Sequence, residues 1–297
     1  MRSEQQMFDL ILNIAKNDKR VLAVYLNGSR ANPQVLADKY QDFDIVYVVN
    51  ETESFLADKK WISVFGETAI VQEPDSKDFG WGQNAAYRQS YCWLMLFKDG
   101  SRIDLHIQTE ELMNKTYGSD SLTIPLLDKN NILPVIPASN DSTYRIKKPD
   151  KKNYNGCCNE FWWCLNNVAK GIVRDQLPYA LRMYNQTSHA ELDKMIEWYI
   201  GANSDFSVSS GMWGKYFKKY LSAEMYKLYL KSCFFCDKNI ELTDYPETAE
   251  SIWVTLFAAC ELFSITAQQV AVFMGYEYNF NDENNMMNYL KKMRADR

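Results

Sequence analysis

Two aspartates and a glycine-serine turn carry the clearest chemical signal in this sequence. The turn, Gly28-Ser29, ends an apolar, β-branched run over residues 21–26, and Asp42 and Asp44 begin a second such run. Glycine permits a tight turn whose backbone N–H groups can face a phosphate. The two-residue period of a strand places both carboxylates on one face, where they can share a divalent ion. The pattern therefore predicts a site for a metal ion and a phosphate group.

Asp104 supplies a third carboxylate on a predicted neighbouring strand. Apolar segments flank an Asp-Gly turn at residues 99–100, and this arrangement indicates a hairpin with Asp104 in its second strand. Mg²⁺ binds oxygen ligands and leaves positions for water and substrate phosphates. A pair of ions about 3.5–4 Å apart needs a further carboxylate to anchor both. We therefore predict that Asp42, Asp44 and Asp104 hold Mg²⁺, with two ions expected, for nucleotidyl transfer.

The composition allows a large core and limits the classes of partner. The chain has 297 residues, of which 46% are hydrophobic; this suits one long domain or two shorter ones, and we favour two. A net charge of −5 and a sequence pI near 5.3 argue against broad neutralisation of nucleic-acid phosphates. We expect small or cationic substrates, no nucleic acid, and a monomer or a small homo-oligomer.

The N-terminus and the cysteines predict a cytoplasmic protein without membrane association. Residues 1–6 lead into an amphipathic segment, so no signal peptide is visible, and we expect no apolar run of about 18 residues or more that would span a bilayer. The seven cysteines are interpreted as reduced thiols, mostly in the core. Cys233 and Cys236 also have metal-ligand spacing, but zinc needs about four ligands and the chain has only two histidines.

The two halves of the chain differ in pattern. The first half predicts an opening amphipathic helix and then strands at residues 21–26, 42–49, 61–65, 69–72, 90–97 and 102–107. Prolines between residues 122 and 149 indicate a connection, after which apolar residues recur at spacings of three and four. We predict an α+β protein. Residues 1–145 form a domain with a mixed β-sheet and flanking helices, and residues 146–297 form a helical bundle.

Each chemical feature alone also has a structural explanation. A Gly-Ser turn is usually only a turn, and alternate strand residues such as Asp42 and Asp44 commonly face water. Trp162 and Trp163 are typical of packing between helices or domains. The combination of the turn with three carboxylates on neighbouring strands is what favours a metal site.

Segments distributed along most of the chain carry a family resemblance. They are Gly28-Ser29-Arg30, Gln41-Asp42-Phe43-Asp44-Ile45, Phe65-Gly66-Glu67, Gln72-Glu73-Pro74, Asp99-Gly100-Ser101-Arg102-Ile103-Asp104-Leu105, Leu127-Asp128-Lys129 and Cys157-Cys158-Asn159-Glu160-Phe161-Trp162-Trp163, followed by Lys170-Gly171. Together they resemble the aminoglycoside 6-adenylyltransferases, also called streptomycin adenylyltransferases. The first part is shared with the wider polymerase-beta-type nucleotidyltransferase superfamily, whereas the segment that begins at Cys157 is much more specific to the family.

The resemblance implies transfer of AMP from ATP to a hydroxyl of streptomycin, with release of pyrophosphate and resistance to the drug. It also implies an N-terminal nucleotidyltransferase domain and a C-terminal helical domain that binds the aminoglycoside, with the substrate between them. Asp42, Asp44 and Asp104 would then hold the Mg²⁺ ions and the ATP co-substrate. The further residues expected to bind ATP are Gly28, Ser29, Arg30 and Lys170.

Glu160 is the predicted fourth catalytic residue. Streptomycin bears guanidinium groups, which bind well to carboxylates and aromatic faces. Glu160 and Trp163 lie three apart on one side of a predicted helix, so Glu160 can pair with the substrate or deprotonate it. Arg182 stands where relatives tend to have the acidic residue expected as general base, and arginine stays protonated. The proton therefore goes to Glu160, to another carboxylate or to water, or the acceptor differs from streptomycin.

Two other functions stay open. Adenylylation of a different small molecule or of a protein hydroxyl is favoured by Arg182. A nucleotide-binding protein without turnover is the second, and three intact carboxylates argue against it because they repel one another without a metal.

Overall fold

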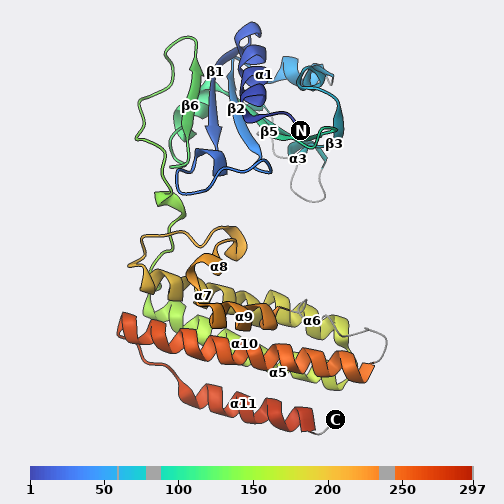
Figure 1. Cartoon of the computed structure of the whole chain (residues 1–297), viewed down its shortest axis with the longest axis vertical. Helices are drawn as coiled ribbons and strands as arrows, with labels where there is room; N and C mark the ends of the chain where they lie inside the picture. Colours follow the sequence, from blue (N-terminus) through green and yellow to red (C-terminus); the bar gives the residue numbers. More distant parts are fainter. Residues whose placement is uncertain (59, 78–87, 234–244, 296–297) are drawn as a thin grey trace. The chain divides into compact units, whose positions relative to one another are not determined.

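The chain divides into two compact units. The computed structural model describes residues 1–58, 60–77, 88–233 and 245–295, and its units are Met1–Thr143 and Tyr144–Arg297 (Figure 1). The predicted boundary lay between residues 145 and 146. Each unit has its own cluster of buried apolar side chains, so each is described separately.

The first unit is built on a mixed six-stranded sheet in the order β3-β4-β5-β2-β1-β6. β2 and β5 pair in parallel, and the other neighbouring strands pair antiparallel. The parallel pair lies in the middle of the sheet, where β2 is almost entirely buried and β5 buries alternate apolar residues. The strands are β1 (Val21–Asn27), β2 (Phe43–Val49), β3 (Thr68–Gln72), β4 (Ser90–Phe97), β5 (Arg102–Thr109) and β6 (Ile124–Asp128).

The opening helix, α1 (Glu4–Asn17), packs on this sheet through one apolar face. Met7, Ile11 and Ala15 recur at helical spacing and are fully buried. Ser3 begins the helix with a capping box, in which its side chain accepts from the backbone N–H of Gln6 and the Gln6 side chain accepts from the N–H of Ser3. The shorter helices of this unit are α2 (Glu53–Ala57), α3 (Pro74–Lys77) and α4 (Glu110–Thr116), with 3₁₀ turns η1 (Ser29–Ala31) and η2 (Trp61–Phe65).

Residues 61–65, predicted as a strand, form the 3₁₀ turn η2, so that prediction was wrong. The aromatic rings of Trp61 and Phe65 lie 5.8 Å apart and both side chains are buried. A strand would hold these two residues about 13 Å apart along the chain. Ring packing therefore favours the tighter turn. The strands predicted at 69–72 and 90–97 are present as β3 and β4.

Among its described residues, the second unit contains helices and connecting loops but no strand. Its longest helix, α10, packs against α7 and α9, and α5 packs against α6, α7 and α11 (Figure 1). These contacts bury the apolar faces that the spacing of three and four predicted. The helices are α5 (Lys151–Val173), α6 (Leu177–Gln186), α7 (Ser188–Asn203), α8 (Phe217–Tyr220), α9 (Ala223–Ser232), α10 (Tyr245–Met274) and α11 (Phe280–Ala295).

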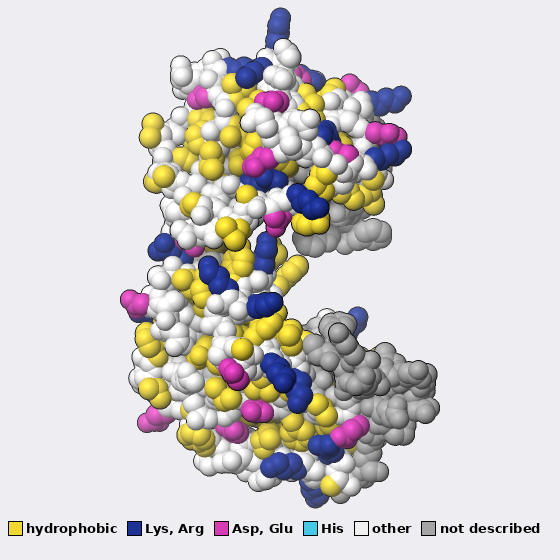
Figure 2. All heavy atoms as spheres, in the orientation of Figure 1, with side chains coloured by type: hydrophobic (Ala, Val, Ile, Leu, Met, Phe, Trp, Pro, Cys, Tyr) yellow, Lys and Arg dark blue, Asp and Glu magenta, His cyan; other side chains and the backbone are white. Residues whose placement is uncertain are grey.

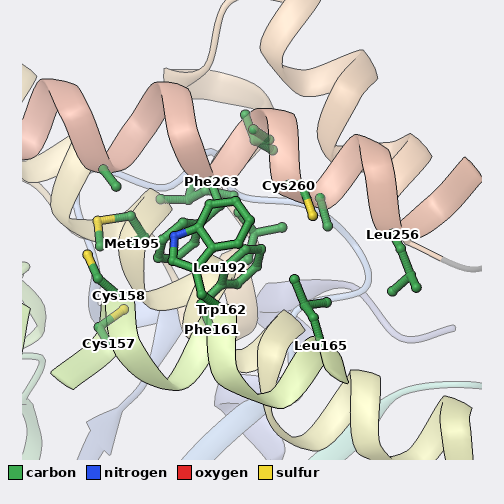
Figure 3. Close-up of a cluster of buried hydrophobic side chains, with 14 of the residues drawn as sticks. Cys157, Cys158, Phe161, Trp162, Leu165, Leu192, Met195, Leu256, Cys260 and Phe263 are labelled. Atoms are coloured by element: carbon green, nitrogen blue, oxygen red, sulfur yellow. The ribbon is translucent and has the colours of Figure 1, made fainter. Parts of the chain in front are cut away.

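Stacked aromatic side chains fix α5 against α10. The rings of Phe161 and Phe263 are nearly parallel, with centroids 3.7 Å apart, and Trp162 meets Phe263 edge-on (Figure 3). Cys157 and Cys158 are buried beside them, in agreement with the packing role predicted for these thiols. Cys236, the second residue of the possible zinc pair, lies outside the described residues.

Part of α10 is long and apolar enough to cross a membrane, which the sequence analysis did not expect. This stretch is Ala249–Met274, and more than half of its most apolar window is buried inside the unit. The central helix of a bundle needs apolar side chains on most of its circumference, because neighbours cover it on several sides. Packing against α7 and α9 therefore accounts for its composition.

Candidate active site

The parallel pairing of β2 and β5 brings two of the predicted metal ligands side by side. Asp44 is the register partner of Asp104 across the two strands. Residues paired in this way project to the same face of a sheet, so the two carboxylates are neighbours. Asp42 immediately precedes β2, whose first residue is the buried Phe43. The structure thus gathers Asp42, Asp44 and Asp104 at the start of two adjacent strands.

Gly28 lies directly against Asp44. It follows β1, where Asn27 is the register partner of Asp44, and it has a φ of 73°. A Cβ atom at this position would come within 2.0 Å of Asp44 Oδ2, so any larger residue would displace the carboxylate. Both the backbone angle and the close approach require glycine here. Ser29 begins η1 at the same edge, so the predicted turn and the predicted metal ligands form one site.

The carboxylates at this edge raise one another's cost of ionisation. Burial raises the pKa of the Asp44 carboxyl to about 6, and the negative charges of Asp104 and Asp42 add to this effect. Positive charges on Arg102 and Arg30 oppose it. The net shift of the Asp44 pKa is upward. A cation bound at this edge would favour the ionised form of Asp44.

Arg102 supplies the nearest positive charge. Its Nε and Nη2 atoms donate to the two carboxylate oxygens of Asp104, both at 2.7 Å, and its Nη1 atom lies 3.2 Å from Asp42 Oδ2. One guanidinium thus bridges two of the three aspartates in a bidentate geometry that strengthens the contact. The pairing of Arg102 with these aspartates was not predicted from the sequence. The only signal for it was the Arg-x-Asp spacing, which places both side chains on one face of a strand.

Arg30 is held by the loop before β2. It donates from Nε to the Asp42 carbonyl at 3.0 Å and from Nη2 to the Gln41 carbonyl at 2.8 Å, and it pairs with Glu4. Its guanidinium also lies 3.8 Å from the ring centre of Phe43, and its side chain is 5% exposed. These contacts hold the backbone at Asp42 in place. They favour a structural role for Arg30, and its contact with a phosphate stays a prediction.

A pocket of about 300 Å³ opens beside Asp42 and Arg102. Its wall combines four cationic and three acidic side chains with polar and apolar residues. Its lining residues are Met1, Arg2, Ser3, Glu4, Arg30, Ala37, Asp38, Lys39, Tyr40, Gln41, Asp42, Phe43, Gly100, Ser101 and Arg102.

A family model described as streptomycin adenylyltransferase matches residues 1–293. The chain belongs to the streptomycin adenylyltransferase family. It is 34% identical over 283 residues to an aminoglycoside 6-adenylyltransferase of Campylobacter jejuni, with 95% of this chain and 93% of that protein covered. It is 32% identical over 292 residues to one of Staphylococcus aureus, with 98% of each chain covered. A solved aminoglycoside 6-adenyltransferase from Bacillus subtilis aligns over 99% of both chains at 27% identity, with a TM-score of 0.45.

Membership of the streptomycin adenylyltransferase family confirms the resemblance seen in the sequence, and it makes this protein a nucleotidyltransferase. Such enzymes act on phosphoryl groups, whose charge a site must neutralise. The aspartates described above suit that task because their oxygens are the donors that Mg²⁺ prefers. Within the described part of the chain, no three His, Cys, Asp or Glu side chains are close enough together to hold a metal ion. The guanidinium of Arg102 is the positive charge between Asp42 and Asp104.

The remaining predicted site residues belong to the second unit, on α5. Glu160 is exposed, and its Oε1 atom accepts from Cys164 Sγ at 3.2 Å. The ammonium of Lys170 donates to Asn166 Oδ1 at 2.7 Å. Lys170 and Trp163, which is 64% exposed, line a groove of about 490 Å³ between α5 and α11. Glu160 lies outside the lining of this groove, and its catalytic role stays a prediction, as does contact of Lys170 with ATP.

Replacing Asp44 by asparagine should stabilise the metal-free protein at high pH. The folded-state pKa of about 6 lies above the ordinary value of 3.8, so ionisation of Asp44 costs stability as the pH rises through this window. The cost reaches about 3 kcal/mol above pH 6 and vanishes below the ordinary pKa. Urea unfolding in a metal chelator should show Asp44→Asn as the more stable form at pH 8. A stability difference that is the same at pH 8 and at pH 4 would contradict the assignment.

Replacing Arg102 by glutamine should destabilise the metal-free protein. Loss of the guanidinium removes its ion pairs with Asp42 and Asp104, at a cost of about 1–3 kcal/mol, because Asp104 is largely buried but Arg102 is partly exposed. Added Mg²⁺ should raise the melting temperature of Arg102→Gln more than that of the wild type. Thermal unfolding with and without Mg²⁺ measures this difference, and equal responses would show that Arg102 and the metal do not share ligands.

Proposed function

We propose that this protein transfers AMP from ATP to a hydroxyl of a streptomycin-like aminoglycoside, releases pyrophosphate and thereby confers resistance. The carrying observation is the Asp44–Asp104 register pair with Gly28 against it, in a chain whose relatives are named aminoglycoside 6-adenylyltransferases. Adjacent carboxylates with a close glycine turn provide the donors that metal-assisted phosphoryl chemistry needs.

The first unit would bind the nucleotide. Asp42, Asp44 and Asp104 would hold Mg²⁺, which when bound neutralises phosphate charge and orients the reacting oxygens. Backbone N–H groups at Gly28 and Ser29 would hold the outer phosphates, because the turn at the end of β1 lies against Asp44. The 300 Å³ pocket beside Asp42 has four cationic and three acidic side chains in its wall, and the cationic ones would contribute to binding a phosphate.

The transfer step makes one bond and breaks one. The substrate hydroxyl oxygen attacks the α-phosphorus of ATP, and the bond from that phosphorus to the bridging oxygen of the β-phosphate breaks, so pyrophosphate leaves. The hydroxyl proton must pass to a base. Glu160 is our candidate because it is an exposed carboxylate on the helix that also carries the exposed Trp163. Trp163 offers an aromatic face to a guanidinium-bearing substrate.

A different acceptor is the alternative with an observation in its favour. Arg182 is exposed on α6 at a position where an acidic residue was expected. An exposed cation repels cationic substrates, whereas it would suit an acceptor with an anionic group. This alternative keeps the AMP transfer and changes only the molecule that receives it.

The charge distribution also fits a small acceptor. On the face drawn in Figure 2, Lys and Arg side chains are interspersed with Asp and Glu over both units. Duplex binding relies instead on a continuous basic surface that neutralises many phosphates. The net charge of −5 favours a cationic substrate over nucleic acid. We propose that the enzyme works on a small cationic substrate in the cytoplasm.

Pyrophosphate release in the presence of Mg²⁺, ATP and a panel of aminoglycosides tests the activity. We expect release that depends on streptomycin, and a loss of at least about 100-fold in Asp42→Asn and Asp44→Asn, because the charge stabilisation of the phosphates is removed. Asp9→Asn, at an exposed position on α1, is the matched control. Release with another acceptor alone would support the alternative, and full activity in the two variants would refute the metal assignment.

The base assignment has its own test. Glu160→Gln should lower kcat by about 100-fold or more, because a general base contributes at this scale. ATP binding, measured by isothermal titration, should stay unchanged because Glu160 contacts the acceptor and not the nucleotide. Glu261→Gln, another exposed carboxylate of the second unit, should retain full turnover. Equal losses of turnover and ATP binding, or no loss, would remove Glu160 from the mechanism.

A further inference from the structure

A thiol, an imidazole and a carboxylate lie side by side in the second unit, with the imidazole in the middle. Cys233 is the residue that ends α9, and its Sγ atom lies 3.6 Å from Nε2 of His189 on α7. The other ring nitrogen of His189, Nδ1, lies 3.5 Å from Oδ2 of Asp193, one helical turn further along α7. The imidazole is therefore placed to take a proton from the thiol while the carboxylate orients and stabilises the resulting cation.

Aromatic side chains enclose this group. The ring of Tyr184 on α6 lies 5.4 Å from the His189 ring, and that of Tyr229 on α9 lies 5.8 Å from it. Burial raises the pKa of both phenols above their ordinary values, so both stay neutral. The side chain of His189 is only 13% exposed, so its interactions with Cys233 and Asp193 are weakly screened by water.

The electrostatics favour a charged imidazole. Burial opposes the positive charge on His189, but hydrogen bonds with Asp193 and Cys233 outweigh burial and raise its pKa to about 9. The Tyr229 phenol faces the same two groups, because Asp193 and Cys233 both contribute to raising its pKa. A protonated histidine beside a sulfur stabilises the thiolate form, which is the nucleophilic one.

Cys233 differs in accessibility from the other described cysteines. It is half-buried, whereas Cys92, Cys157, Cys158, Cys164 and Cys260 are buried. Burial raises the pKa of the thiols of Cys92 and Cys158 to about 12, so these residues are neutral and inert at physiological pH. Cys233 therefore combines access to solvent with an adjacent imidazole.

We propose that Cys233, His189 and Asp193 form a reactive thiol site that exchanges with low-molecular-weight disulfides. This property is separate from adenylyl transfer. The thiol, the imidazole and the carboxylate are the groups that activate a cysteine for such an exchange.

The exchange forms one sulfur–sulfur bond and breaks one. His189 Nε2 holds the proton of the Cys233 thiol, and the thiolate attacks one sulfur of the disulfide. A bond forms between Cys233 Sγ and that sulfur, and the original sulfur–sulfur bond breaks. The second sulfur leaves as a thiolate and takes up the proton, so no further oxidant is needed. The product is a mixed disulfide at the end of α9.

Alkylation by iodoacetamide tests the site on the full-length protein. Peptide mass spectrometry measures the initial rate at Cys233 from about pH 5 to pH 9, with glutathione as the reference thiol. At pH 6 we expect Cys233 to react at least about tenfold faster than glutathione, because its sulfur lies beside the His189 imidazole, while Cys92 stays unmodified. A Cys236→Ser background removes the neighbouring thiol from the measurement. A wild-type profile that follows glutathione would overturn the proposal without any variant of the triad.

Two variants separate activation from simple exposure. His189→Gln should slow Cys233 at pH 6 by about tenfold, to the rate of an ordinary thiol. Tyr184→Phe is the matched control: it keeps the ring beside His189 but removes the hydrogen bond from the Tyr184 hydroxyl to the Ser232 carbonyl, which fixes the end of α9. Its rate should match the wild type. An unchanged rate in His189→Gln, or faster alkylation in both variants, would show that opening of the helix end explains the reactivity. Glutathione disulfide should then form a mixed disulfide with the wild type, and its failure to do so would also refute the exchange.

Discussion

The mutual repulsion of Asp44 and Asp104 is the constraint around which the first unit is organised. Their register on adjacent parallel strands forces two carboxylates together at a partly buried edge, and burial together with this repulsion raises the pKa of Asp44. Gly28 leaves room for Asp44, and Arg102 neutralises its neighbours. A sheet that served only stability would not concentrate charge in this way, so the arrangement is consistent with a site that binds a cation.

The mixed topology is what makes this register possible. Asp44 and Asp104 are far apart in sequence, and β2 joins β5 only because β3 and β4 are added on the outer side of β5. A slip of one residue would turn Asp104 to the opposite face and bury a charge among apolar side chains. The alternation of buried Ile103, Leu105 and Ile107 prevents that slip. Hydrophobic packing thus fixes the positions of the charged groups.

Local patterns were enough to predict much of this fold and the proximity of Asp44 to Asp104. Apolar runs located β1 and β4, an Asp-Gly pair located the hairpin before Asp104, and helical spacing identified the second unit. Contacts between distant residues were beyond that method. The guanidinium of Arg102, the ring packing that turned residues 61–65 into a 3₁₀ turn, and the approach of Cys233 to His189 all depend on side chains brought together by the tertiary fold.

The two units also differ in how substitutions can act. In α5 the buried side chains of Phe161 and Leu165 fix the rotation of the helix about its axis, and so they fix which residues face outward. Exposed positions such as Glu160 and Trp163 can then change with little effect on packing, since surface substitutions usually cost little stability. The register-bound aspartates lack that freedom. Under the proposed function, the reaction type depends on the aspartates of the sheet, whereas acceptor preference can change through exposed residues of the helices, of which Arg182 is an example.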